Sequence, residues 1–385
     1  MPPFFLFLCF LLSLFSGVFA WFFQVTLLFT VDIFHKNNWL VFFLPLAALF
    51  IYWFYEKIKD KGISSPGGRV VSELSSPKSF LPFLLIPVTY FFTLFSHLFG
   101  ASVGREGVAV QVGTTFAENL GRWFRVTEKQ KKTLMMCGVA SGFAALFGTP
   151  LTAVAFAYEF CRKKPSWRSA PAVLGVSFLS YGISDALGTP HTQFSDIPYP
   201  EFWLNVLWFD GALCIALLIC CWVFIKGQQF YGDLFSKTKP FIKPVLTSLM
   251  LTITFYFVGT SGFASLGLPF IAEAFSSESL QHGVGDAFLK LVLIAFSLQA
   301  GFKGGEVTPL FATGALLGAA IAFEFGLSPE FGAAIGLSVL FPSLAKAPMT
   351  GIILGIEVFG LESLVHVMPI ILVLQGFGPK KGLYR

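Results

Sequence analysis

The chain has 385 residues, of which 55% are hydrophobic and only 12% are charged, and its net charge is +5. Soluble domains carry about 25% charged residues, so this composition excludes an ordinary soluble protein and predicts a membrane protein with on the order of ten crossings. The basic residues stand in short loops between apolar runs, which gives no indication of nucleic-acid binding. The six cysteines have neither metal-site spacing nor the pattern of a disulfide framework.

The first apolar stretch covers residues 1–30 and predicts a membrane helix at the start of the chain. It resembles a secretory signal peptide only in hydrophobicity, because it lacks a basic beginning and its apolar part is too long. Cleavage after Gly17–Ala20 is the alternative interpretation.

Apolar runs continue to the end of the chain, and several are shorter than the roughly 20 residues that span a bilayer. Several are also interrupted by glycine or proline, as at Gly148–Pro150 and Lys346–Pro348. Short, interrupted helices in matching places of two halves indicate a transporter with a site near the middle of the membrane, whereas re-entrant or buried helices are the alternative. The runs cover residues 3–34, 39–55, 80–103, 107–121, 133–159, 170–187, 203–225, 241–258, 284–300, 308–325, 330–343, 347–359 and 363–377.

Clusters of basic residues predict the orientation in the membrane. By the positive-inside rule these clusters face the cytoplasm, and the loops at residues 35–38 and 191–200, which are poor in basic residues, face outward. The clusters lie at residues 57–61, 122–132, 162–164, 237–243 and 380–385.

Two glycine-rich segments each place one carboxylate directly before an apolar run long enough for a helix. The first is Gly104–Gly107, which contains Glu106, and the second is Gly304–Pro309, which contains Glu306. Glycine lets backbone N–H groups approach a bound anion, and the start of a helix carries partial positive charge. Because ionisable residues inside a membrane protein mark function by default, we expect an anion site at these helix starts.

Both carboxylates also have structural interpretations. Glu106 stands where a glutamate often stabilises the first turn of a helix, and Glu306 is close enough in sequence to form an ion pair with Lys303. We favour a gate role for Glu106: deprotonated, its carboxylate occupies the anion site, and protonated, it withdraws or passes on the proton. For Glu306 we favour a direct role in ion or proton movement.

The two halves of the chain repeat. Pro150–Phe160 resembles Pro348–Val358, and nearly the same offset separates Glu106 from Glu306. Two features with one period predict a duplicated unit, with a first membrane repeat at residues 1–195 and a second at residues 196–385. The two repeats together form one transport domain, and inverted topology is a further expectation.

These segments resemble the CLC family of chloride channels and transporters. Gly-Arg-Glu-Gly at residues 104–107, followed by Val-Gln-Val-Gly at residues 110–113, is similar to the signature of the family. Gly-Thr-Pro-Leu-Thr at residues 148–152 and Lys-Ala-Pro-Met-Thr-Gly at residues 346–351 resemble its two proline-containing helix starts. The resemblance implies an all-α integral membrane protein of the CLC-type fold, with two inverted-topology repeats of short, tilted and broken helices. It also implies a homodimer with one pore in each subunit.

The segment Gly-Gly-Glu-Val-Thr-Pro at residues 304–309 resembles the fluoride-transporting branch of the family, and Tyr384 fits the place of the pore tyrosine. Val108 replaces the usual proline, as is typical of that branch. The stretch at residues 64–69 departs from the family's first anion loop and from the replacements typical of the fluoride branch. Phe160 stands where proton-coupled chloride members have a second glutamate, so proton transfer needs another route.

The resemblance implies a fluoride/proton antiporter that exports fluoride from the cytoplasm across a bacterial inner membrane. A proton-independent fluoride or chloride channel is the alternative. No polar catalytic cluster indicates an enzyme, and we expect no cofactor or metal; the expected partners are fluoride or chloride, protons and the lipid bilayer. Gating and proton roles fall to Glu106 and Glu306. The expected anion-binding residues are Gly67, Gly68, Gly104, Arg105, Gly107, Val108, Gly305, Val307, Thr308 and Tyr384.

Overall fold

A computed structural model describes residues 2–58, 81–161, 167–192, 194, 196–201, 204–236, 238–276 and 280–384. Within these ranges the chain forms fifteen α-helices and no β-strand, as the sequence predicts. The predicted anion-binding residues Gly67 and Gly68 lie outside the described residues.

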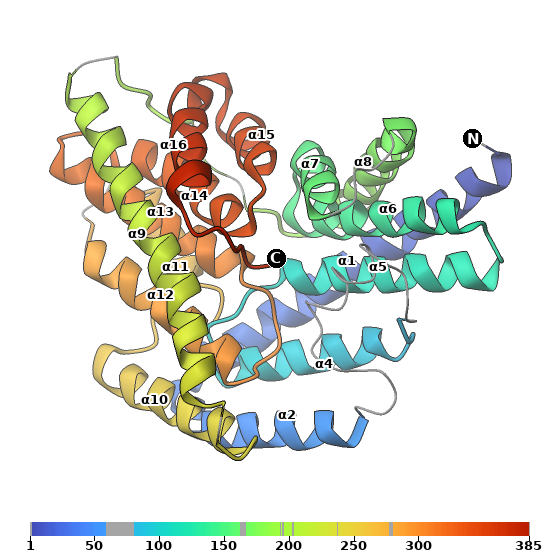
Figure 1. The fold of residues 1–385 in the computed structure, drawn as a ribbon, viewed down its shortest axis with the longest axis horizontal. Coiled ribbons are helices and arrows are strands. Elements are labelled where there is room, and N and C mark those ends of the chain that lie inside the picture. Colours follow the sequence, from blue (N-terminus) through green and yellow to red (C-terminus); the bar gives the residue numbers. More distant parts are fainter. Residues whose placement is uncertain are drawn as a thin grey trace.

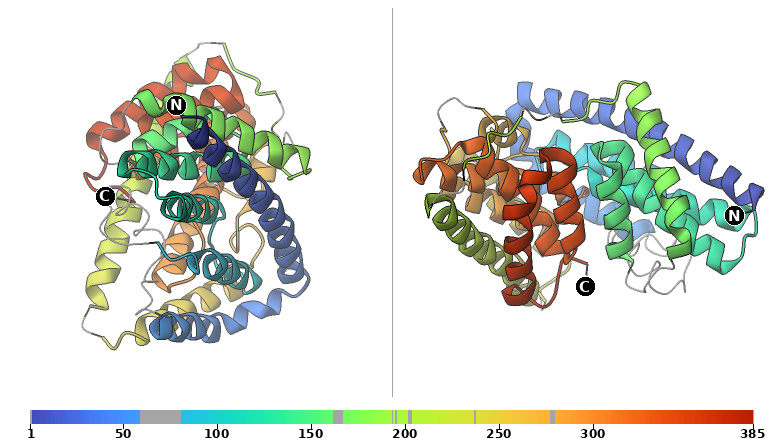
Figure 2. Two further views of the ribbon diagram at one scale, coloured as in Figure 1. Left: turned by 90° about the vertical axis from the view of Figure 1, so that its right-hand side faces the viewer. Right: turned by 90° about the horizontal axis from the view of Figure 1, so that it is seen from above.

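The helices of the first half include one long helix, which confirms the helix predicted at the start of the chain. Figure 2 shows α1 running along the edge of the molecule, where it packs against α6 and α8. The helices are α1 (Pro3–Lys36), α2 (Leu44–Ile58), α4 (Leu85–Leu98), α5 (Glu106–Trp123), α6 (Glu128–Phe147), α7 (Pro150–Phe160) and α8 (Ala170–Ala186).

The second half begins with another long helix and continues with shorter ones. In Figure 1 its yellow to red helices lie on one side and the blue to green helices on the other, with the C-terminus near the middle. The helices are α9 (Leu204–Leu234), α10 (Ile242–Val258), α11 (Leu268–Ala274), α12 (Val284–Gln299), α13 (Val307–Glu324), α14 (Pro329–Ala345), α15 (Pro348–Phe359) and α16 (Leu364–Phe377).

Several helices have the length and apolarity of membrane spans. In the described part of the chain these are Pro3–Lys36, Asn38–Ile58, Leu204–Leu234 and Val307–Glu324. Large apolar side chains cover the outside of α9, where Leu204, Trp208 and Phe230 are all exposed. Exposed apolar surface on this scale fits contact with lipid.

The helix breaks fall at matching places in the two halves. Gly148 ends α6 in the left-handed region with φ 85°, and Pro150 begins α7. Lys346 ends α14 with φ 58°, and Pro348 begins α15. A left-handed residue ends a helix by turning the chain, and proline is favoured in the first turn because its missing N–H needs no partner there. The single apolar run predicted at residues 133–159 is therefore two helices.

Glycines bring the backbones of neighbouring helices into contact. On α5 and α6, a Cβ at Gly113 or Gly138 would overlap the carbonyl of the other residue. Gly318 of α13 and Gly332 of α14 make the same kind of contact in the second half. Small residues allow close helix packing in membranes, where no hydrophobic effect drives helices together. These two helix pairs hold the starts of α5 and α13 in fixed positions.

A glutamate of each half also caps the start of a helix in the other half, at α7 and α15. Glu357 of α15 accepts hydrogen bonds from the N–H groups of Leu151 and Thr152 at 2.8 and 2.7 Å. Glu159 of α7 accepts the equivalent bonds from Met349 and Thr350 at 2.9 and 2.8 Å. Each threonine hydroxyl also donates to the same carboxylate at 2.7 Å. Each half therefore satisfies the free N–H groups at a helix start of the other half.

Candidate functional site

The starts of α5 and α13 are joined by a short backbone bridge. Gly305 N–H donates to the Gly104 carbonyl at 2.8 Å, and Gly104 N–H donates to the Gly305 carbonyl. A Cβ on Gly107 would lie 3.0 Å from the Gly305 Cα, so this close approach requires glycine. The bridge holds Glu106 and Glu306, from opposite halves of the chain, within one site.

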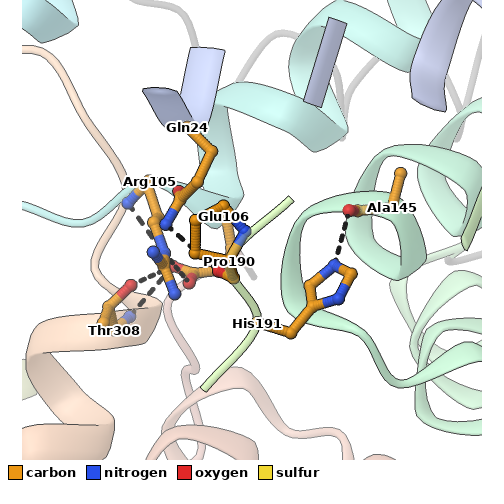
Figure 3. Close-up of polar contacts among 7 residues, drawn as sticks. All are labelled: Gln24, Arg105, Glu106, Ala145, Pro190, His191 and Thr308. Carbon is orange, nitrogen blue, oxygen red and sulfur yellow. Dashed lines mark hydrogen bonds and ion pairs between the residues drawn. The ribbon is translucent and has the colours of Figure 1, made fainter. Parts of the chain in front are cut away.

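Glu106 reaches across this bridge to the other half. Its side chain is fully buried, and one carboxylate oxygen accepts hydrogen bonds from Thr308 N–H at 3.1 Å and from the Thr308 hydroxyl. The other oxygen accepts a hydrogen bond from Arg105 Nε at 3.2 Å, as Figure 3 shows. Thr308 lies in the first turn of α13, where helix N–H groups have no partner within the helix. The Glu106 carboxylate thus occupies an anion position at the start of α13.

Other contacts in Figure 3 fasten the loop that follows α8. Gln24 of α1 donates from Nε2 to the Pro190 carbonyl at 3.5 Å. His191 Nε2 donates to the Ala145 carbonyl at 3.1 Å, and its ring packs against Gly148. These bonds tie the loop to α1 and α6 in the first half.

A cavity of about 320 Å³ lies beside this pair of helix starts. The predicted residues that line it are Gly107, Val108, Gly305, Glu306, Val307 and Tyr384, whereas Gly104, Arg105, Glu106 and Thr308 are buried and are not part of the lining. A side-chain hydrogen bond joins Glu306 to Tyr384. The cavity wall therefore contains a carboxylate and a phenol, both of which can exchange protons or contact an anion.

Aromatic rings line the cavity around Tyr384. The Phe160 ring stands edge-on to Tyr384, with centroids 5.1 Å apart and planes at 71°, and Phe156 lies 5.1 Å from Phe160. Phe160 faces the cavity, while Glu159 next to it is bonded to the start of α15. Where a second glutamate was absent from the sequence, Phe160 therefore places an aromatic ring that packs against Tyr384.

Lys303 lines the cavity but does not pair with Glu306. Among the described residues, the ion pair that the sequence suggested as an alternative is not formed, and the Lys303 ammonium lies 4.1 Å from the centroid of the Tyr55 ring. Hence the structural interpretation of Glu306 as an ion-pair partner of Lys303 is not supported.

Sequence reasoning did not assign a site role to four polar residues in the cavity wall. Gln111 follows Gly107 by one helical turn on α5, so the motif and the helical period together contained the signal for it. Thr89 of α4 lies within an apolar run, and Gln228 of α9 follows the run at residues 203–225; neither position carried such a signal. The fourth, Lys303, was seen only as a partner for Glu306.

Residues 47–375 match the family described as voltage gated chloride channel. The chain belongs to this family, the CLC family. The resemblance drawn from the motifs is therefore confirmed, and so is the all-α membrane fold. The protein is a CLC anion transporter of multi-pass membrane type.

Relatives of this CLC protein include one from Pseudomonas syringae pv. tomato (strain ATCC BAA-871 / DC3000), described as a chloride/fluoride channel protein. The two are 30% identical over 336 residues, which is 85% of this chain and 73% of the relative. A crystal structure of a CLC-type fluoride/proton antiporter matches with a TM-score of 0.88 and 30% identity over 98% of this chain and 96% of that chain. A slow cyanobacterial Cl⁻/H⁺ antiporter matches with a TM-score of 0.82 and 19% identity, over 99% of this chain and 96% of that chain; at this identity it shows the fold alone.

Proposed function

We propose that this CLC protein is a fluoride/proton antiporter that exports fluoride from the cytoplasm. The observation that carries the proposal is the Glu106 carboxylate bound to Thr308 at the start of α13, beside a cavity that contains Glu306 and Tyr384. A titratable anion in this position competes with a free anion for the same donors. The likeness to a CLC-type fluoride/proton antiporter adds support.

Competition at Thr308 links the movements of fluoride and protons. The charged Glu106 carboxylate accepts from Thr308 N–H and hydroxyl, and in this state it holds the anion position. Protonation removes its negative charge and weakens these charge-assisted bonds. A fluoride ion then takes the two Thr308 donors while the neutral acid moves away with its proton.

Fluoride demands close donors because it is small and strongly hydrated. Thr308 supplies a hydroxyl and a backbone N–H at the helix start, and Tyr384 supplies a hydroxyl inside the cavity. Gly107 and Gly305 let the backbone come close to an ion, and Val307 adds a first-turn N–H group, whereas Val108 N–H donates to the Arg105 carbonyl at 3.1 Å. We assign anion binding to these residues and to Gly104, Arg105, Gly67 and Gly68.

Glu306 gives the proton a route that avoids Phe160. It lies at the start of α13, two residues before Thr308, and it borders the cavity with Tyr384. We propose that Glu306 exchanges protons with the cavity and with Glu106. We further propose that the protein works as a homodimer with one pore per subunit in a bacterial inner membrane.

The alternative function is a proton-independent channel for fluoride or chloride, which the description of the Pseudomonas syringae relative favours. Measurement of the reversal potential in proteoliposomes, under opposing proton and fluoride gradients, separates the two. An antiporter moves fluoride against its own gradient when a proton gradient is applied. A reversal potential fixed by fluoride alone would reject the antiporter and support the channel.

A further inference from the structure

Lys303 is a cation in the wall of the cavity whose partner is not a carboxylate. Among the described residues that line the cavity, it is the cation and Glu306 is the carboxylate, and these two form no ion pair. Its ammonium instead lies 4.1 Å from the centroid of the Tyr55 ring. An aromatic ring orients a cation without neutralising it. The positive charge therefore remains available to an anion in the cavity.

The backbone at Lys303 is fixed, so the side chain starts from a defined position. Lys303 N–H donates to Ser96 Oγ at 2.9 Å, which joins the loop before α13 to the end of α4. A charge held inside a membrane protein has a desolvation cost of several kcal/mol unless a partner of opposite charge is present. A transported anion in the cavity can supply this opposite charge, because no carboxylate among the described residues does so.

Two neutral groups in the same wall lack partners. Thr89 and Gln111 are 2% and 4% exposed, and Thr89 Oγ1 and Gln111 Nε2 have no hydrogen-bond partner among the described residues. Leaving a buried polar group unsatisfied costs about 1–3 kcal/mol. Both groups can donate a hydrogen bond, and an anion, with its water, accepts from such donors.

We propose that Lys303, with Gln111 and Thr89, forms a second subsite for a small inorganic anion in the cavity, separate from the Thr308 position that Glu106 occupies. Tyr55 is the positioning residue that holds the ammonium in place. The subsite receives the anion before it competes with Glu106. This inference rests on the proposed transport function, because it assigns the anion to the path that ends at Thr308.

The test compares charge removal at Lys303 with charge removal at a matched lysine. Lys57 is exposed on α2, and its ammonium lies at the same 4.1 Å from a ring centroid, that of Trp53, away from the cavity. Initial fluoride efflux from proteoliposomes is measured against internal fluoride concentration. We expect Lys303→Gln to raise KM about tenfold with little change in kcat, as the loss of a charge-assisted contact predicts.

Conservative variants separate a binding role from a structural one. Lys303→Arg and Tyr55→Phe keep the charge and the ring, so both should keep KM within about threefold of the original value. Tyr55→Leu, which removes the ring, should raise KM in the same direction as Lys303→Gln. The subsite is overturned if Lys303→Gln has the KM of Lys57→Gln, or if it lowers kcat alone.

A binding measurement keeps this inference distinct from the proposed function. Isothermal titration of the purified protein with sodium fluoride and with sodium chloride reports the subsite without transport. Anion binding that weakens in Lys303→Gln supports the subsite even when the original protein proves not to couple fluoride to protons. Unchanged binding in Lys303→Gln, alongside normal coupled transport in the original protein, rejects the subsite and leaves the antiporter intact.

Discussion

At the scale of single residues, the site depends on a carboxylate from one half bonded to a threonine of the other. Both site carboxylates could be predicted from the sequence, because glycine beside an acid at a helix start is a local pattern. Thr308 could be predicted as a donor at the same helix start. Its bond to Glu106 could not, because that bond depends on how two distant segments meet. Thr89 and Lys303 were missed for the same reason, since a cavity is built from side chains far apart in the chain.

Replacement of Glu106 by glutamine tests its role as the proton-carrying gate. Glutamine has a similar shape and still accepts from Thr308, but it does not titrate. We expect Glu106→Gln to abolish proton uptake coupled to fluoride efflux, with both followed in the same vesicles. Glu128→Gln, at the exposed start of α6, is the control. Coupled proton uptake that persists in Glu106→Gln would show that another group carries the proton.

Glu306→Gln tests the second carboxylate. Loss of a positioned proton-transfer group lowers rates by about 100-fold or more, so we expect fluoride turnover to fall by about this factor. The amount of folded protein should change far less, because Glu306 forms no ion pair with Lys303 among the described residues. Turnover per folded protein is measured after size-exclusion chromatography. A normal rate with normal proton stoichiometry would make Glu306 structural.

At the scale of helices, the positions of the helix breaks could be predicted from the sequence, but the helices that pack against one another could not. Glycine and proline at residues 148–150 and 348 mark where α7 and α15 begin. The start of α6 also has a local signal, since Thr127 and Gln130 cap each other. Helix α11 has only seven residues and follows Gly267 with φ 79°, so no apolar run predicted it. Glu159 and Glu357 each cap a helix of the opposite half, a pairing that depends on how the two halves meet.

The exchanged caps should contribute equally to stability. Glu159→Ala and Glu357→Ala each leave two helix N–H groups and a threonine hydroxyl without their acceptor. We expect each to lower the free energy of unfolding by about 2 kcal/mol. Thermal unfolding in detergent measures the effect, with Glu324→Ala at the exposed end of α13 as control. Variants no less stable than this control would show that solvent replaces the caps without cost.

At the scale of the whole molecule, we expect the complete path to set the proposed preference for fluoride over chloride. The proposed path combines helix starts from both halves, Tyr384 near the C-terminus, and the cavity between them. Membership of the CLC family and the all-α fold followed from motifs that lie far apart in the chain. The proposed division into repeats at residues 1–195 and 196–385 stays a prediction, as does inverted topology.

Fluoride should leave proteoliposomes much faster than chloride does. The physical reason is the set of close donors around Thr308, which replaces the hydration of a small ion better than that of a large one. We expect initial efflux of fluoride to exceed that of chloride by at least about tenfold, a difference of about 1.4 kcal/mol between the two barriers. Electrodes selective for each anion measure both rates in matched vesicles. Equal rates would show that the protein transports both halides without selecting fluoride.

The exchanged glutamates have a consequence for how such a molecule arises. Glu159 binds the start of α15 as Glu357 binds the start of α7, and each bond set contains two N–H groups and one threonine hydroxyl. Reciprocal contacts of this kind are what two identical chains make about a twofold axis. In an ancestor with half the present length, one glutamate and one threonine would form both bond sets at once. Selection acting on that single pair would be felt twice in every assembled molecule of such an ancestor.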